Sequence, residues 1–224
     1  MQQTAANLAS QKPLNLPRLL LKLAVCIVGI GIISFSSAIL YLIQLGSDPY
    51  QLLAVSVHLR LGISYGQANN LLNGAIILFM LLFKRRYIKL SLFLCLLVSG
   101  AFTDFFTGLL SPFVSAALPL VVRLALALAS CILLAFGVYL YITPALGASP
   151  ADSVGLILAD ITGQPYRIIR IGTDTTFALL GVLLGATLGV ATIMTAFLTG
   201  PFIGVFQRLL DRKPWIQKLA EKSA

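Results

Sequence analysis

The sequence repeats itself at a nearly constant distance, and this repeat constrains the fold more than any other feature. Gly147 follows Gly46 by 101 positions. The same offset aligns further pairs: Phe35 with Phe136, Pro49 with Pro150, Gly62 with Gly163 and Tyr65 with Tyr166. Later in the chain the offset becomes 100, so that Gly100 aligns with Gly200. In a membrane protein, such a repeat predicts a pseudo-symmetric bundle with any binding site where the halves meet.

The composition is that of a membrane protein. Apolar residues make up 58% of the chain and charged residues only 10%, whereas a soluble domain has roughly 25% charged residues. The three cysteines lie scattered in apolar runs, at Cys26, Cys95 and Cys131, so neither a disulfide framework nor a metal site is indicated. We therefore expect an all-α protein in contact with the lipid bilayer, without a metal or other cofactor.

Six apolar stretches are long enough to cross about 30 Å of hydrocarbon at about 1.5 Å per residue. They are approximately residues 19–44, 68–83, 88–110, 118–144, 168–184 and 185–206. Two shorter apolar pieces, 49–61 and 150–161, occupy equivalent places in the two copies and are predicted to be re-entrant or interfacial helices. The predicted organisation is an N-terminal segment (1–18), two membrane repeats (19–111 and 112–210) and a C-terminal tail (211–224).

The distribution of lysine and arginine predicts the orientation. If the N-terminus is cytoplasmic and the short pieces do not cross the membrane, only Arg60 and Arg123 lie on the external side. The other basic residues then face the cytoplasm, as the positive-inside rule requires, and both termini are cytoplasmic. This accounts for the net charge of +9 without a nucleic-acid partner. Three spans per repeat make the repeats inverted, as in many alternating-access transporters. Four spans per repeat would give a parallel duplication instead.

Each copy contains a helix stop followed by a helix start. A glycine that can end a helix precedes an N-cap residue, and proline then takes the first helical position. The candidate substrate-binding residues in these turns are Gly46, Ser47 and Asp48 in the first copy, and Gly147 and Ser149 in the second. At membrane depth, the free N–H groups of the new helices would bind an anionic group such as a carboxylate. The alternative is a pair of surface loops that lead into interfacial helices.

Two polar residues inside predicted spans complete the candidate site. Asp174 lies near the middle of its span, and its repeat equivalent is Asn73. A carboxylate and an amide at one pseudo-symmetric position predict a central polar pair, because polar residues within a bilayer tend to face a cavity or a partner. The alternative is that Asp174 only pairs with Arg170, four residues earlier on the helix. A third polar residue, Asp104, is expected to face water or Arg123.

No motif for catalysis is found. The chain has no phosphate-binding loop, no His-Glu-x-x-His, no paired catalytic carboxylates and only one histidine, so we predict that it is not an enzyme and has no catalytic residues. The tail from Arg208 to Lys222 mixes basic and apolar residues and predicts a cytoplasmic interfacial helix. Docking of a protein partner through this tail, or formation of a homo-oligomer, is an alternative role.

Several landmarks resemble the bacterial YczE/YyaS/YitT membrane proteins. They are the Leu-Gly-x-x-Pro turns at 45–49 and 146–150, the polar run at 62–73 and the Leu-Thr-Gly-Pro-Phe-Ile-Gly-Val-Phe segment at 198–206. The chain resembles the YczE branch more than the YitT branch, which usually carries a soluble C-terminal domain. The resemblance implies a bacterial inner-membrane protein and supplies no catalytic residues. The repeat and the polar residues together favour a secondary transporter or exporter of a small organic solute that works by alternating access. The alternative is a membrane factor that assists assembly or localisation of a partner protein.

Overall fold

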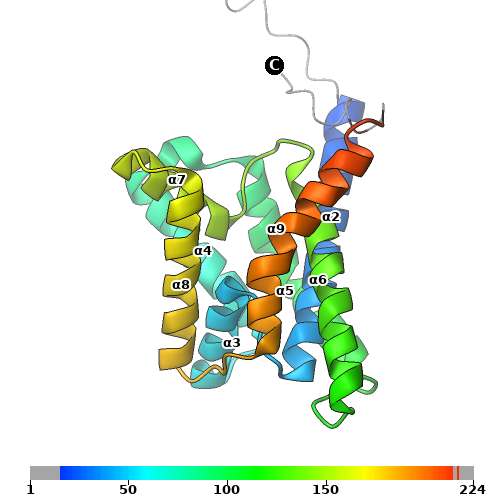
Figure 1. The fold of residues 1–224 in the computed structure, drawn as a ribbon. Helices are drawn as coiled ribbons and strands as arrows, with labels where there is room; N and C mark the ends of the chain where they lie inside the picture. The colour runs from blue at the N-terminus through cyan, green and yellow to red at the C-terminus, as the bar shows by residue number, and fades with distance from the viewer. Residues whose placement is uncertain (1–15, 214–215, 217–224) are drawn as a thin grey trace, which may run out of the picture.

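The computed structural model describes residues 16–213 and Ile216, and all regular secondary structure in this part of the chain is helical (Figure 1). Eight α-helices and one 3-10 helix are present there, and no strand. They are α2 (Leu16–Ile43), α3 (Pro49–Leu61), α4 (Tyr65–Phe83), η1 (Arg85–Tyr87), α5 (Leu90–Leu110), α6 (Leu120–Ile142), α7 (Pro150–Thr162), α8 (Tyr166–Leu183) and α9 (Val190–Leu210). The predicted N-terminal segment and the amphipathic tail fall largely outside the described residues.

Four of these helices, α2, α5, α6 and α9, are long and apolar enough to cross a membrane. The other two predicted spans correspond to α4 and α8, which are 19 and 18 residues long. They are less apolar, because α4 carries asparagines and α8 carries Arg170 and Asp174. The structure thus supports a helical membrane protein, and spanning by α4 and α8 stays a prediction.

The predicted helix breaks are confirmed. Both short helices, α3 and α7, are 13 residues long and begin with proline. Before each of them the chain turns at a glycine with positive φ, 95° at Gly46 and 136° at Gly147. These φ values favour glycine because a Cβ atom is strained there. The two copies therefore share the same backbone punctuation as well as the same residue pattern.

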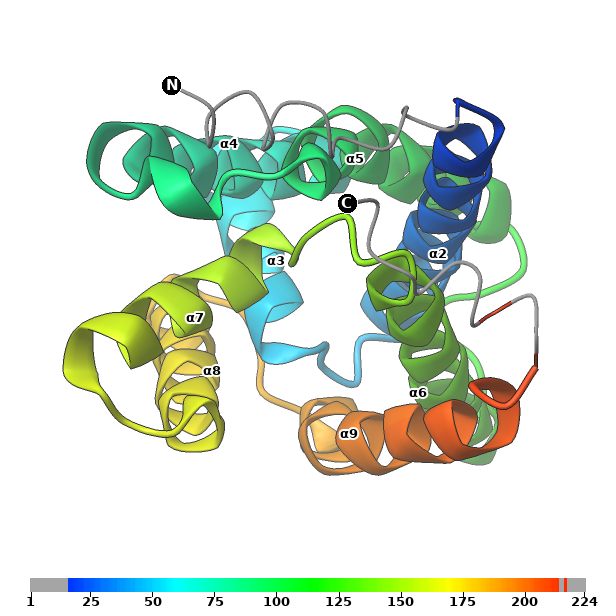
Figure 2. The same cartoon turned by 90° about the horizontal axis from the view of Figure 1, so that it is seen from above.

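The helices pack in matched pairs. Helix α2 lies against α5 as α6 lies against α9, and α3 lies against α4 as α7 lies against α8. Between the copies, α2 packs along α6, and their backbones approach where Gly29 meets Gly137. One pair breaks the pattern, because α4 packs closely on α5 whereas α8 makes no comparable contact with α9. Figure 2 shows α8 and α9 standing apart, joined by a connection at the far end.

Each break is held by the other copy. The N–H of Ala191, at the start of α9, donates to the carbonyl oxygen of Leu45 at 2.9 Å. In the equivalent place, the Ser91 hydroxyl at the start of α5 donates to the carbonyl oxygen of Ala148 at 3.2 Å. The first contact lies at the lower end of the bundle in Figure 1 and the second at its upper end.

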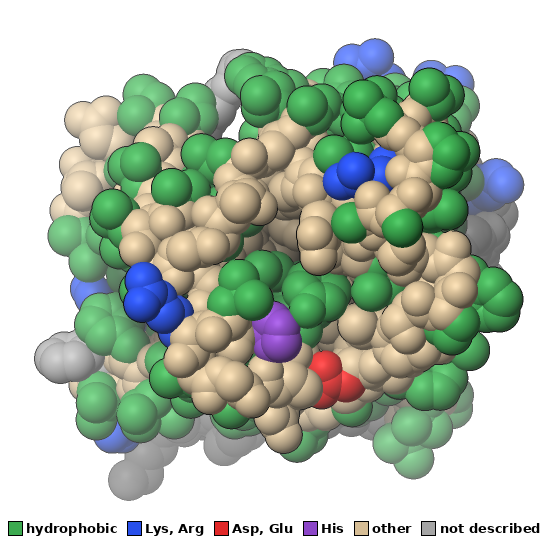
Figure 3. Space-filling model, turned by 90° about the horizontal axis from the view of Figure 1, so that it is seen from below, with side chains coloured by type: hydrophobic (Ala, Val, Ile, Leu, Met, Phe, Trp, Pro, Cys, Tyr) green, Lys and Arg blue, Asp and Glu red, His purple; other side chains and the backbone are tan. Residues whose placement is uncertain are grey.

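Basic residues gather at the upper end of the bundle. Within the described chain they include Lys84, Arg85, Lys89, Arg208, Arg212 and Lys213, which lie in or beside η1 and the end of α9. The face seen from below carries few charged side chains (Figure 3). At this lower end, Arg60 donates to the carbonyl oxygen of Leu184 at 2.8 Å and Arg123 to that of Ile43 at 2.9 Å. Both arginines thus bind carbonyl groups at helix C-termini.

Candidate functional site

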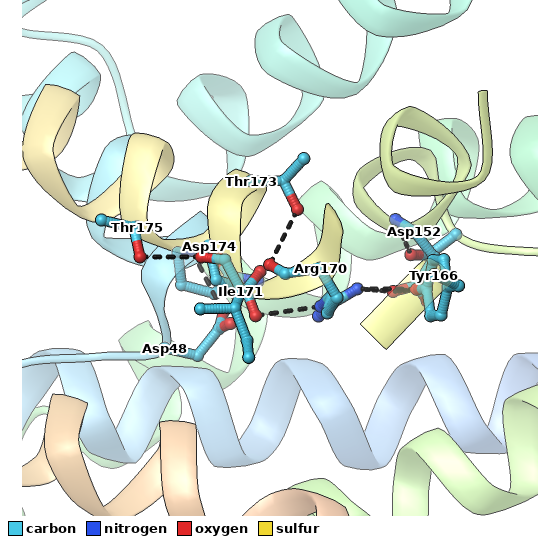
Figure 4. A network of polar contacts seen from close by, with 10 residues as sticks. Asp48, Asp152, Tyr166, Arg170, Ile171, Thr173, Asp174 and Thr175 are labelled. Atoms are coloured by element: carbon cyan, nitrogen blue, oxygen red, sulfur yellow. Dashed lines mark hydrogen bonds and ion pairs between the residues drawn. The ribbon is translucent and has the colours of Figure 1, made fainter. Parts of the chain in front are cut away.

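The centre of the candidate site is Arg170, held between carboxylates from two helices. Its Nε donates to Asp174 at 2.9 Å within α8, and its Nη1 forms an ion pair with Asp152 of α7. The Tyr166 hydroxyl also donates to Asp152, at 3.4 Å. Asp48, from the first copy, lies beside this group (Figure 4). We call these five residues the Arg170 cluster.

Helix capping explains why acids from α3 and α7 reach Arg170. Asp48 is the N-cap of α3, and its carboxylate accepts the Gln51 N–H at 3.1 Å. Ser149 is the N-cap of α7 and accepts the Asp152 N–H at 3.1 Å. The cap fixes the first turn of each helix, and the two first turns face Arg170 on α8. The N–H groups expected to bind a substrate carboxylate are thus partly used by the protein's own side chains.

Asp48 is the acid of this cluster without an ion pair among the described residues. It lies in the turn between α2 and α3, outside the four helices that qualify as spans. Burial raises the pKa of the Asp48 carboxyl above its ordinary value, and the Gln51 N–H and the Arg170 charge only partly oppose this increase. The Asp174 charge contributes to the increase. The Asp48 carboxyl therefore holds a proton more readily than an exposed aspartate does.

A second polar group lies between α3, α4 and α5. The Tyr50 hydroxyl donates to the side-chain oxygen of Asn73 at 2.7 Å, and the Tyr65 hydroxyl donates to that of Gln51 at 2.9 Å. The amide groups of Asn73 and Asn69 both donate to the Ser99 hydroxyl of α5, each at 3.3 Å. We call Tyr50, Gln51, Tyr65, Asn69 and Asn73 the amide cluster.

The two clusters are repeat equivalents. The 101-residue offset aligns Gln51 with Asp152, Tyr65 with Tyr166, Asn69 with Arg170 and Asn73 with Asp174. The hydrogen bond from Tyr65 to Gln51 corresponds to that from Tyr166 to Asp152. The same local framework is therefore neutral in the first copy and charged in the second. The sequence alone had paired Tyr65 with Tyr166 and Asn73 with Asp174, and the same offset also identifies the other two pairs.

A third polar group joins α4 to α5, and it corrects the expectation that Asp104 pairs with Arg123. This half-buried carboxylate does not pair with Arg123, which binds the carbonyl groups of Ile43 and Gln44; it accepts the Ser64 hydroxyl at 2.5 Å and the Gly66 N–H at 2.7 Å. Nearby, the Gly100 N–H donates to the side-chain oxygen of Asn70 at 3.1 Å. We call Ser64, Gly66, Asn70, Gly100 and Asp104 the clasp. Their repeat equivalents are Pro165, Arg167, Ile171, Gly200 and Gly204, which cannot form the same contacts.

The remaining predicted residues lie apart from the cluster. Gly46 packs against Gly189 and Thr192 at the start of α9. In the second copy, Gly147 packs against Lys89 and Ser91 at the start of α5. Ser47 is buried. The structure thus brings Asp48 and Asp174 together, while the two glycines shape the turns on which the caps depend. The described residues include no group of three or more histidines, cysteines or acids suited to a metal ion.

Comparison with known proteins gives a family without an assigned activity. Residues 20–208 match a family of unknown function, DUF6198. The chain is 30% identical to the uncharacterized membrane protein YczE of Bacillus subtilis, over 70% of this chain and 71% of that protein. It is 26% identical to an uncharacterized protein of Haemophilus influenzae, over 87% of both chains. It is 22% identical to YyaS of B. subtilis, over 82% of this chain and 92% of that protein. No solved structure matches the chain.

The match to the family model covers most of the described helices, from α2 to α9. It includes both helix breaks and all three polar groups, so the site lies within the region that the family shares. The expected resemblance is thereby confirmed for YczE and YyaS. The chain belongs to the DUF6198 family of YczE-like bacterial membrane proteins.

Proposed function

We propose that this protein is a secondary transporter of a small organic solute that works by alternating access in the bacterial inner membrane. The observation that carries the proposal is the Arg170 cluster, in which Asp48 from the first copy meets three charged residues of the second. A charged side chain at the centre of a bilayer costs about 2.5–3.5 kcal/mol on insertion scales. Because a charge within the bilayer is this costly, the charged residues of the Arg170 cluster favour a role in binding the solute or in coupling its transport.

The topology we propose has six spans and cytoplasmic termini. Helices α4 and α8 complete the six, and α3 and α7 enter the bilayer without crossing it. The accumulation of lysine and arginine at the upper end in Figure 1 supports a cytoplasmic location for that end. With three spans in each copy, the copies have opposite orientations.

The difference between the copies supports alternation. The clasp holds α4 to α5 in the first copy, whereas the equivalent α8 and α9 are not packed together. In transporters with inverted repeats, exchange of the conformations of the two copies moves the open side from one face to the other. We propose that α8 approaches α9 while the clasp loosens, and that the Arg170 cluster is exposed to the opposite side as a result.

The test is solute-driven proton movement in liposomes. The purified protein is reconstituted with an internal pH indicator and challenged with chromatographic fractions of a bacterial extract. We expect at least one fraction to move protons, and Asp174→Asn to reduce the rate by about tenfold or more because it removes a charge from the cluster.

The matched control is Asp160→Asn, the same substitution on an exposed residue of α7 far from Arg170. It should retain the wild-type rate. If the wild-type protein moves no more protons than empty liposomes with any fraction, the transport proposal is wrong. We also propose that the protein is not an enzyme. The alternative role in assembly of a partner depends on the tail, most of which lies outside the described residues.

A further inference from the structure

The site contains one buried hydrogen-bond acceptor without a donor. The tyrosine hydroxyls at both clusters are engaged, as are Nε and Nη1 of Arg170. By contrast, the side-chain oxygen of Asn69 is buried and has no hydrogen-bond partner. Asn69 is only 3% exposed. A buried acceptor left without a donor costs about 1–3 kcal/mol, so this oxygen indicates a place where a ligand supplies a donor.

The position of Asn69 connects this oxygen to the α3 turn. Tyr65, Asn69 and Asn73 follow one another at intervals of four residues, so they share one face of α4. The residues on either side of Asn69 on that face bond to Gln51 and Tyr50 in the first turn of α3. Asp48 caps the same turn. Asn69 therefore lies on the face of α4 that contacts the first turn of α3, next to the turn that Asp48 caps.

The charges at this junction do not balance. Asp48, Asp152 and Asp174 contribute three negative charges when ionised, and Arg170 contributes one positive charge. The N-termini of α3 and α7 add roughly half a positive charge each. The remainder is about one negative charge. It is shared between Asp48 and the two acids that bridge to Arg170, because one arginine neutralises only one of those two acids.

We propose that the solute of this site is an organic cation, whose charge pairs with Asp48 and whose N–H group donates to the side-chain oxygen of Asn69. This inference rests on the proposed function and identifies the chemical class of its substrate. It differs from the sequence-based expectation of an anionic group, because the Asp48 carboxylate already caps α3 and the first turn of α7 already contains Asp152. Aromatic rings also border the site, with Tyr50 and Phe177 at 5.4 Å between centroids, and such rings favour cations.

The test compares three probes of similar shape on the purified full-length protein in detergent. Benzylammonium carries a charge and N–H donors, benzyltrimethylammonium carries the charge alone, and benzoate carries the opposite charge. Binding is measured as a concentration-dependent rise in the melting temperature, at constant ionic strength against sodium chloride. We expect benzylammonium to stabilise most, benzyltrimethylammonium less, and benzoate not at all.

Two variants separate the contributions. Asp48→Asn should raise the apparent Kd for benzylammonium by about tenfold or more, because a charge-assisted hydrogen bond contributes about 1.5–3 kcal/mol. Asn69→Leu removes the unpartnered oxygen with little change of volume, so it should fold and should reduce the difference in affinity between benzylammonium and benzyltrimethylammonium. Asp160→Asn is the control and should bind like the wild type.

Several outcomes would overturn the inference. They are stabilisation by benzoate that depends on Asp48, equal effects of the amines on wild type and Asp48→Asn, and no effect of either amine beyond that of sodium chloride. Cation binding without flux in liposomes would reject transport and leave this inference standing. Flux of an anionic solute without cation binding would support transport and reject this inference.

Discussion

Gly66 is the position where the clasp is most sensitive to added volume. A Cβ atom there would lie 2.7 Å from the Asp104 carboxyl carbon, and closer still to the carbonyl oxygen of Gly100. Ordinary van der Waals contact begins at 3.4 Å, so α4 and α5 would have to separate by about 0.7 Å on the Asp104 side alone. We therefore predict that Gly66→Ala weakens the packing of α4 on α5.

The expected magnitude follows from three contributions. Overpacking costs about 1–3 kcal/mol, and separation weakens the bond from the Gly66 N–H to Asp104, a charged acceptor, for which about 1.5–3 kcal/mol is at stake. Alanine gains up to about 1 kcal/mol over glycine in a helix. The net loss is about 2–4 kcal/mol, which lowers the melting temperature by roughly 5–15 °C in a protein of this size.

Thermal unfolding with a thiol-reactive fluorescent dye suits this measurement, because Cys26, Cys95 and Cys131 are all buried and become reactive on unfolding. Gly108→Ala on α5 is the matched control, since a Cβ atom there meets nothing within 4 Å. The control should melt at or slightly above the wild-type temperature. The steric reasoning is refuted if Gly66→Ala melts like the wild type, or if both variants lose the same stability.

Three further predictions concern the Arg170 cluster and the proposed motion. Asp174→Asn should reduce flux about tenfold while the melting temperature changes little, since asparagine still accepts a hydrogen bond from Arg170; unchanged flux and pH dependence would leave Asp174 with a structural role only. Arg170→Lys should lower stability by about 1–3 kcal/mol, because lysine cannot donate in two fixed directions to two acids, and a wild-type melting curve would contradict the bridging role. Ile171 and Gly200 are the repeat equivalents of a contact within the clasp. If both are replaced by cysteine in a cysteine-free background, a short bismaleimide should cross-link them in membranes, and the cross-linked protein should lose flux. If no cross-link forms at any pH while a pair across α2 and α6 reacts, α8 does not approach α9.

Local chemistry made the helix breaks predictable. The sequence Gly46, Asp48, Pro49 contains a turn glycine, a cap and a helix start, and the structure has the cap and the start at the expected residues. Helix α2 itself ends at Ile43, just before the turn at Gly46. The pair of Asp174 with Arg170 was also weighed from sequence, since it depends only on spacing along one helix. Such features need no knowledge of how helices pack.

Contacts between distant helices were not predictable in the same way. The bond from Ser64 to Asp104 joins residues 40 positions apart, and Arg170 meets Asp152 from a different helix. Which helices become neighbours is decided by packing of the whole bundle, and apolar periodicity does not determine it. The repeat offset contains part of this information, because it aligns Asn69 with Arg170 and so points to a cluster in each copy.

The exchange of contacts between the two halves has a consequence for biogenesis. The carbonyl group of Leu45 receives its hydrogen bond from Ala191, so the first half completes its turn only after most of the second half has been synthesised. At about 5–20 residues per second, this delay is on the order of ten seconds. Throughout that interval, the start of α3 with Asp48 lacks its final neighbours in the membrane. Premature release of the nascent chain, or truncation before α9, would therefore be expected to leave a half that inserts but does not mature, and that membrane quality control can recognise.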